Sequence, residues 1–189
     1  MLWQETVARI SGLMVARIAN WMFKISRFET KNLVIEHELL GVTPEMIDWW
    51  WQNMSQTEHY KLWHPRDHIR AELEVREEGG KTIQIQHVME KIGGIPTLLH
   101  LRFEDPHNLP IPIEYDHAFG GSGLDRSGRP YSYALHQYEE MPGGTRMRST
   151  FILPAKAPKA FARALRKHNC EEMAQFPRFL PQLYKEKTL

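Results

Sequence analysis

From Lys31 onward, hydrophobic positions recur mostly with the two-residue period of β-strands. Strand-like runs cover Asn32–Leu40, Ala71–Arg76, Thr82–Glu90, Thr97–Glu104, Tyr131–Glu139 and Thr145–Leu153. Turn signals separate them, including Gly79-Gly80, Gly93-Gly94, Asp105-Pro106, Gly120-Gly121 and Gly143-Gly144. The pattern therefore predicts a sheet of antiparallel strands.

Helical signals flank these strands. Thr43 is suited to cap a helix, Pro44 suits its first turn, and that helix carries Trp49, Trp50 and Trp51. A second short helical stretch ends at the segment 60–63. Near the C-terminus, apolar residues at helical spacing predict one long helix over about 158–187.

One strand, two short helices, a run of antiparallel strands and a long final helix are typical of an α+β helix-grip fold. In that architecture a curved sheet wraps the last helix and leaves an apolar cavity between them. We expect residues 29–189 to form this domain and residues 1–28 to form a separate amphipathic helix.

The N-terminal segment has an apolar stripe that includes Trp3, Ile10, Met14 and Trp21. Charged residues interrupt it too often for a membrane span, and it lacks a clear signal-peptide pattern. A helix lying on a membrane surface is one interpretation. We favour a helix packed on the body of the protein or on a second subunit, which makes a homodimer through this helix a candidate arrangement.

Composition narrows the function. The chain has 189 residues, 42% of them hydrophobic, and a formal net charge of +1, so it is long enough for one substantial core. It lacks the basic, aromatic-interleaved runs that indicate nucleic-acid binding. Its single cysteine, Cys170, allows no internal disulfide, which favours a reducing, cytoplasmic location. Ten histidines and six tryptophans would suit an aromatic pocket with a metal ion.

His168 and Glu172 are the first candidate metal ligands. They are four residues apart in the predicted final helix, so both lie on one of its faces. An imidazole and a carboxylate so placed can bind one metal ion, although such a pair is more often a solvated polar pair. The metal interpretation depends on further ligands elsewhere.

Two more candidate metal ligands lie at the ends of predicted strands: His68 just before one strand and Glu90 at the end of the next. His68 follows the second short helix, and Pro65 separates it from His64. Glu90 ends a strand in which Gln86, Val88 and Glu90 share one face. By pattern alone, an exposed position at the strand end is the more common setting for such a glutamate.

Several motifs, taken together, resemble the diacetylphloroglucinol hydrolase and phloretin hydrolase family of metal-dependent carbon–carbon hydrolases. The motifs are Asp48-Trp49-Trp50-Trp51, the run from Tyr60 to His68, Glu90-Lys-Ile-Gly-Gly, His136 with Gly143-Gly144, Arg148-Ser149-Thr-Phe151, and His168-Asn-Cys-Glu-Glu172 running on to Tyr184. They occur in the family's order. The resemblance implies a Bet v 1-like cavity and a metal ion, usually zinc, bound by His68, Glu90, His168 and Glu172.

The resemblance also implies a reaction. A metal-activated water would cleave the bond between an acyl group and a phenolic ring in a small aryl ketone. His136 would carry a proton, and Tyr60 would hydrogen-bond a substrate oxygen. A solvent-facing histidine and an ordinary core tyrosine are the alternatives. Two nitrogen and two oxygen ligands also suit Fe²⁺ or Mn²⁺.

The chain departs from the family pattern at two positions. Phe151 stands where a tyrosine is expected, and Ala71 stands where an asparagine is expected, so two polar substrate contacts would be missing. Candidate substrate-binding residues are Trp50, Phe151, His117 and Arg148. For His117 a turn-stabilising role, and for Arg148 a surface position, are the alternatives.

The family's larger enzymes carry an N-terminal domain, and here the first 25 or so residues would replace it with a helix. Gly120-Gly121-Ser-Gly123 lacks the lysine and helix of a phosphate loop, which excludes nucleotide binding. The leading prediction is the carbon–carbon hydrolase. An isomerase or cyclase using the same metal cavity, and a non-catalytic carrier of hydrophobic small molecules, are the alternatives.

Overall fold

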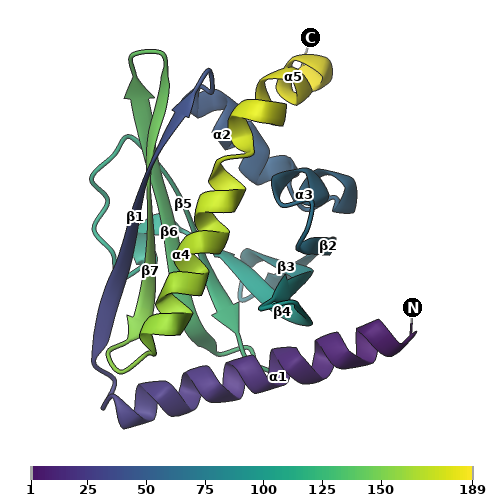
Figure 1. Ribbon diagram of the computed structural model, residues 1–189, viewed down its shortest axis with the longest axis vertical. Coiled ribbons are helices and arrows are strands. Elements are labelled where there is room, and N and C mark those ends of the chain that lie inside the picture. The colour runs from purple at the N-terminus through teal and green to yellow at the C-terminus, as the bar shows by residue number, and fades with distance from the viewer. Residues whose placement is uncertain (1, 189) are drawn as a thin grey trace.

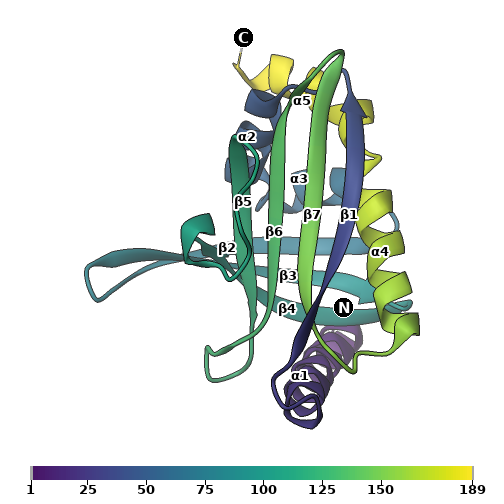
Figure 2. The same cartoon turned by 90° about the vertical axis from the view of Figure 1, so that its left-hand side faces the viewer.

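Seven antiparallel strands form one continuous sheet in the order β1-β7-β6-β5-β4-β3-β2. The structure is a computed structural model and describes residues 2–188. The strands are β1 (Thr30–Leu40), β2 (His68–Glu78), β3 (Lys81–Ile92), β4 (Ile95–Glu104), β5 (His117–Leu124), β6 (Pro130–Met141) and β7 (Gly144–Pro154). The sheet is strongly coiled, so β2, β3 and β4 cross the direction of the other four strands (Figure 2). This coil creates the inner face that the C-terminal helices cover.

Strand β5 differs from the sequence prediction, which took Gly120-Gly121 as a turn. Both glycines lie inside the strand and pair with Leu135 and Ala134 of β6. A Cβ at Gly120 would lie 2.4 Å from Leu109 Cδ1, so the glycine lets the loop after β4 pack closely on the outer face. Gly120 therefore permits close packing of that loop, and both glycines lie within a continuous strand.

Two short helices connect β1 to β2. Helix α2 (Pro44–Asn53) begins as predicted, with Thr43 as its cap: the Thr43 hydroxyl accepts a hydrogen bond from the backbone N–H of Met46. Helix α3 (Thr57–Trp63) follows, and its last turn leads directly to His68 at the start of β2.

The long final helix of the sequence prediction is divided into α4 (Lys159–Met173) and α5 (Phe176–Thr188). The break falls at residues 174–175, just before Pro177. Pro177 has no backbone N–H to donate to the Met173 carbonyl, as a continuous helix would require, and it lies instead in the first turn of α5, where that bond is not needed. Helix α4 lies between β1, β7 and β6 on one side and β2–β4 on the other, as the helix-grip prediction required (Figure 1).

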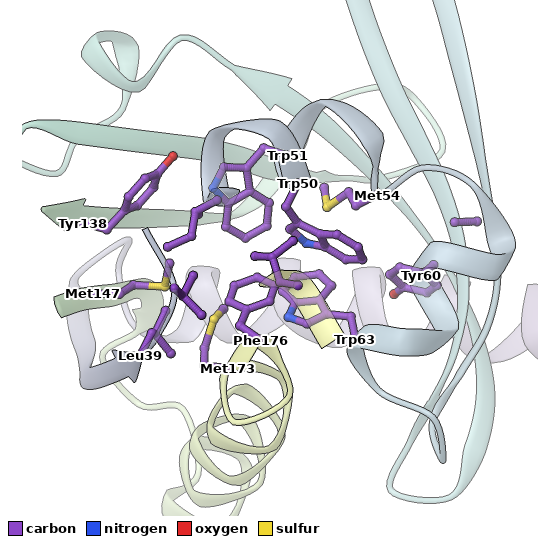
Figure 3. Close-up of a cluster of buried hydrophobic side chains, with 14 of the residues drawn as sticks. Leu39, Trp50, Trp51, Met54, Tyr60, Trp63, Tyr138, Met147, Met173 and Phe176 are labelled. Atoms are coloured by element: carbon purple, nitrogen blue, oxygen red, sulfur yellow. The ribbon is translucent and has the colours of Figure 1, made fainter. Parts of the chain in front are cut away.

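Aromatic side chains fill much of the space between α2, α3, α5 and the sheet (Figure 3). Trp50 and Phe176 are fully buried there, and Trp51 and Trp63 pack edge to face at 5.5 Å. Burying such rings contributes a few kcal/mol each. A large part of the predicted apolar cavity is therefore occupied by the protein's own core.

Helix α1 (Leu2–Ile25) covers the part of the sheet where β4 separates from β5. Strands β4 and β5 pair only between the segments 101–104 and 120–123, so the first half of β4 has a free edge. Ser11 of α1 donates its hydroxyl to the Pro96 carbonyl oxygen at 2.7 Å on that edge. One side of α1 therefore packs on the body of the protein, as predicted. No helix among the described residues is long and apolar enough to span a membrane.

Gly12 is the closest contact between α1 and β4, and replacing it with alanine is expected to loosen the helix. A Cβ at this position would lie 2.0 Å from the Leu98 carbonyl oxygen, which is backbone and cannot turn away. We expect a loss of about 1–3 kcal/mol in the free energy of unfolding, measured by urea denaturation. Gln4→Ala, at an exposed position of the same helix, is the control. Equal stability of Gly12→Ala and the control would contradict this packing.

Candidate metal centre

The structure brings the four candidate ligands together from three elements. His68 starts β2, Glu90 lies opposite it on β3, and His168 and Glu172 lie on α4. Glu172 Oε1 lies 3.2 Å from His68 Nε2 and 3.4 Å from His168 Nε2, and Glu90 Oε2 lies 3.6 Å from His68 Nε2. One ligand atom each from His68, Glu90 and His168 lies within 4.8 Å of the others.

These spacings fit a tetrahedral metal ion. With bonds of about 2.0–2.2 Å, neighbouring ligand atoms of zinc are about 3.3–3.6 Å apart. The Nε2 atoms of His68 and His168 are buried, and among the described residues neither makes a hydrogen bond of acceptable geometry. Two buried imidazole nitrogens directed at carboxylate oxygens form a donor set that a divalent cation would satisfy.

Charge couples the two α4 residues. Burial by itself would lower the pKa of His168, but the negative charge of Glu172, supported by Glu90 and Asp67, raises it to about 10. Burial would raise the pKa of Glu172, yet the facing imidazolium of His168 holds it well below its ordinary value. Without a cation the pair is therefore an imidazolium and a carboxylate, and a metal ion would displace the proton of His168.

Tyr60 fixes the first two candidate ligands. Its ring stacks on the His68 ring with centroids 3.8 Å apart, and its backbone carbonyl accepts a hydrogen bond from His68 Nδ1 at 2.8 Å. That contact leaves the Nε2 lone pair free to face the carboxylates. The Tyr60 hydroxyl donates to Glu90 Oε2 at 2.6 Å. Tyr60 is thus placed to orient His68 and Glu90, and its expected contact with substrate stays a prediction.

Asn169 and His37 support Glu172, and the sequence analysis missed both. The Asn169 amide lies 3.5 Å from Glu172 Oε2, and its Oδ1 lies 2.9 Å from His37 Nε2 of β1. His64 stacks on His168 at 4.6 Å, and Asp67 lies 3.8 Å from His168 Nδ1. Asn169 precedes Glu172 by three residues, a helical spacing that could have indicated it.

His136 lies on the inner face of β6, as a residue of the interior. Its Nδ1 lies 2.8 Å from the Ser149 hydroxyl, its ring stacks on Trp51 at 5.3 Å, and Phe151 meets it edge to face at 5.9 Å. Burial lowers the pKa of His136 to about 4, so the imidazole is neutral at neutral pH. Trp51, which the sequence analysis did not choose among the three tryptophans, is the one that contacts His136.

The buried neutral His136 predicts a pH dependence of stability. Its pKa falls from 6.5 to about 4 on folding, so between these values the unfolded chain binds a proton that the folded protein does not. This residue's contribution to stability is complete above pH 6.5 and is lost as the pH falls toward 4. In metal-free protein, wild type should lose stability more steeply than His136→Gln between about pH 7 and pH 4 in urea unfolding. Equal slopes would contradict a neutral buried imidazole.

Two candidate substrate contacts, Trp50 and Arg148, have partners within the protein itself. Arg148 is on the outer face of β7, one position from the inward-facing Ser149, and it pairs with Glu36 and Glu114. Trp50 is fully buried against Trp63, Phe176, Phe179 and His59. Arg148 thus has the surface position that was its alternative, and contact of Trp50 with substrate stays a prediction.

His117 is ion-paired to Asp48 of α2, with Nδ1 and Oδ2 2.9 Å apart, and it stacks on Tyr138 at 5.4 Å. Tyr138 donates its hydroxyl to the other oxygen of the same carboxylate. This arrangement joins α2 to β5 and β6. The side chain of His117 is one third exposed, so its proposed contact with substrate stays a prediction.

A hollow of about 300 Å³ opens where β4 and β5 separate, beneath α1. Leu98 and Leu99 of β4 line it together with Gly12 and Leu13 of α1. Tyr131 lines it too, and burial together with the charge of Glu90 raises the pKa of this tyrosine to about 12. None of the four candidate ligands lines the hollow, and Tyr131 was not singled out from the sequence.

The fold places the chain among Bet v 1-like helix-grip proteins. It is similar to protein NE0264 from Nitrosomonas europaea, with a TM-score of 0.53 and 14% identity over 82% of this chain and 96% of that one. It is also similar to Ara h 8.0201, with a TM-score of 0.53 and 11% identity over 82% and 99% of the two chains. These likenesses concern the fold alone.

The chain belongs to the family described as the DAPG hydrolase PhiG domain, whose sequence model matches residues 30–163. It is 25% identical to phloretin hydrolase of Eubacterium ramulus over 183 residues, 77% of this chain and 64% of that protein. The chain thus spans less than two thirds of this relative's length. The segment that matches the family model, residues 30–163, contains His68 and Glu90 but ends before His168 and Glu172. The geometry of α4 provides separate support for those two residues.

Proposed function

We propose that this protein is a metal-dependent hydrolase that cleaves the carbon–carbon bond between an acyl group and a phenolic ring. The observation that carries the proposal is the convergence of His68, Glu90, His168 and Glu172 around one point in the interior. Membership of the DAPG hydrolase family and similarity to phloretin hydrolase support an acylphenol as the substrate class.

The four ligands would hold Zn²⁺, with Fe²⁺ or Mn²⁺ as alternatives, because two imidazoles and two carboxylates suit all three ions. When bound, the metal supplies Lewis acidity at the acyl carbonyl and lowers the pKa of a water molecule toward neutrality. Tyr60 and Asn169 hold Glu90 and Glu172 in position, which preserves the site's geometry during turnover.

His136 would move the proton that the ring needs. Hydrolysis consumes one water molecule and yields a carboxylic acid and a ring carbon that has gained hydrogen. A neutral imidazole can take a proton from a phenolic hydroxyl and return it to that carbon, and the lowered pKa keeps His136 neutral. The ring would lie on the inner face of the sheet near Phe151, which meets His136 edge to face.

Product analysis tests the proposed reaction. Purified protein loaded with zinc is incubated with a panel of acylphenols in oxygen-18 water. The proposal expects the deacylated phenol together with a carboxylic acid that carries one labelled oxygen. An isomer or cyclised product would support the alternative reaction, and binding without conversion would support a small-molecule carrier.

The free thiol of Cys170 is the basis for a proposed cytoplasmic location.

Phe151→Tyr is expected to improve turnover of more hydroxylated ketones. Phe151 meets His136 edge to face on the inner sheet surface, so a hydroxyl added there would offer the ring a hydrogen-bond donor. We expect kcat/KM to rise about 5- to 10-fold for a trihydroxylated ketone relative to a monohydroxylated one, which corresponds to one added hydrogen bond. The ratio of the two values is the measurement. An unchanged ratio would place Phe151 outside the substrate pocket.

A further inference from the structure

The outward side of α1 carries an apolar stripe that the rest of the protein does not cover. Its members are Trp3, Ile10, Met14, Ile18 and Trp21, with exposed fractions of 74%, 54%, 55%, 54% and 57%. They are three, four or seven residues apart, so they lie along one side of the helix. Large exposed apolar patches of this kind mark interaction surfaces.

The opposite side of α1 already satisfies the packing of the helix on the protein. Ala8, Ala16 and Met22 are buried there, and Gly12 and Ser11 sit directly on β4. The apolar stripe is therefore not required to hold α1 in place. Both views show α1 at the base of the molecule, with no other element beyond it (Figures 1 and 2). A flat surface could touch the helix along its whole length of about 36 Å.

Basic side chains accompany the stripe on one flank. Arg17 and Lys24 are exposed there, and Arg9 follows further round the helix. Glu5, the acidic residue of α1, is held by Arg70 at 3.3 Å and lies near Arg9 at 3.6 Å. Just past the helix, Phe28 is 71% exposed. Tryptophans at both ends, an apolar stripe and a basic flank are typical of helices that lie on anionic lipid.

We propose that α1 docks this protein on an anionic phospholipid surface, with the helix lying in the plane of the interface. The stripe would enter the region between headgroups and acyl chains, and Arg17 and Lys24 would face lipid phosphates. A second copy of this chain fits less well. In an antiparallel pair related by a two-fold axis, the same flank of each helix meets its counterpart, so the basic flanks would repel.

Vesicle flotation with the full-length protein tests the proposal. The two vesicle types are phosphatidylcholine alone and phosphatidylcholine with one quarter phosphatidylglycerol. We expect at least about tenfold stronger partition to the anionic vesicles, falling as NaCl rises from about 0.05 M to about 0.5 M. Trp3→Ser with Trp21→Ser should abolish binding, and Arg17→Gln with Lys24→Gln should remove the preference for anionic lipid.

Val75→Ser is the matched control, because Val75 is 56% exposed on β2, away from the stripe, and its replacement should leave partition unchanged. Circular dichroism confirms that each variant is folded. Failure of wild type to float with anionic vesicles would overturn the proposal, as would equal binding to both vesicle types. Light scattering that shows a dimer lost with the tryptophans, without flotation, would overturn it by assigning the stripe to a second copy.

Discussion

Replacing Glu172 with glutamine is expected to remove the bound metal and abolish hydrolysis. Glu172 Oε1 faces both imidazole nitrogens, so the substitution takes a negative charge from the centre of the ligand set. Changes to residues that only support ligands cost about 10–100-fold in metal affinity, and the loss of a ligand should cost more than that. Elemental analysis after dialysis gives the metal content, and product formation gives the activity.

Glu171→Gln is the matched control for this prediction. Glu171 is the preceding residue on α4, but its carboxylate binds Arg66 at 2.8 Å and lies 3.4 Å from His64 Nε2, so it contacts none of the four candidate ligands. That variant should keep its metal and its activity. In metal-free Glu172→Gln, the pKa of His168 should also fall from about 10, because its main negative neighbour is gone. A wild-type metal content in Glu172→Gln would exclude Glu172 as a ligand.

His136→Asn is expected to keep the metal and lose turnover by about 10²–10⁴-fold, the usual contribution of a general acid–base residue. His136 contacts Ser149, Trp51 and Phe151 rather than the metal group, so its removal should leave metal binding intact. Metal content and kcat are measured on the same preparation.

His107→Asn, in the surface 3₁₀ turn η1 (Pro106–Asn108), is the control for a histidine replaced far from the interior. It should leave kcat and metal content unchanged. Near wild-type kcat in His136→Asn would show that another group carries the proton, and Tyr131 would then be the next residue to replace.

Local sequence patterns predicted most of the elements, and long-range packing explains where they were wrong. Six of the strands, the start of α2 and the helix-grip arrangement follow from periodicity and turn residues. Strand β5 was missed because Gly120 and Gly121 are typical turn residues, although Gly120 in fact makes room for Leu109 of the loop that connects β4 to β5. The final helix was predicted as continuous because apolar spacing persists across the break before Pro177.

Local sequence patterns alone were not enough to predict the candidate metal centre. Spacing alone linked His168 to Glu172, and resemblance to a family linked that pair to His68 and Glu90. Asn169 could have been found from its spacing to Glu172, but His37 could not. His37 meets Asn169 across 132 positions of the chain, and no local pattern records such a contact. A motif also does not show which side of its strand faces the interior, as Arg148 on the outer face of β7 illustrates.

Metal analysis of the purified wild-type protein tests the central claim most directly. The protein is exposed to Zn²⁺, Fe²⁺ or Mn²⁺, dialysed, and measured by elemental analysis and X-ray absorption. The account predicts about one retained ion per chain, with only nitrogen and oxygen neighbours at about 2.0–2.2 Å. A protein that retains none of the three ions, or binds one through the sulfur of Cys170, would contradict it.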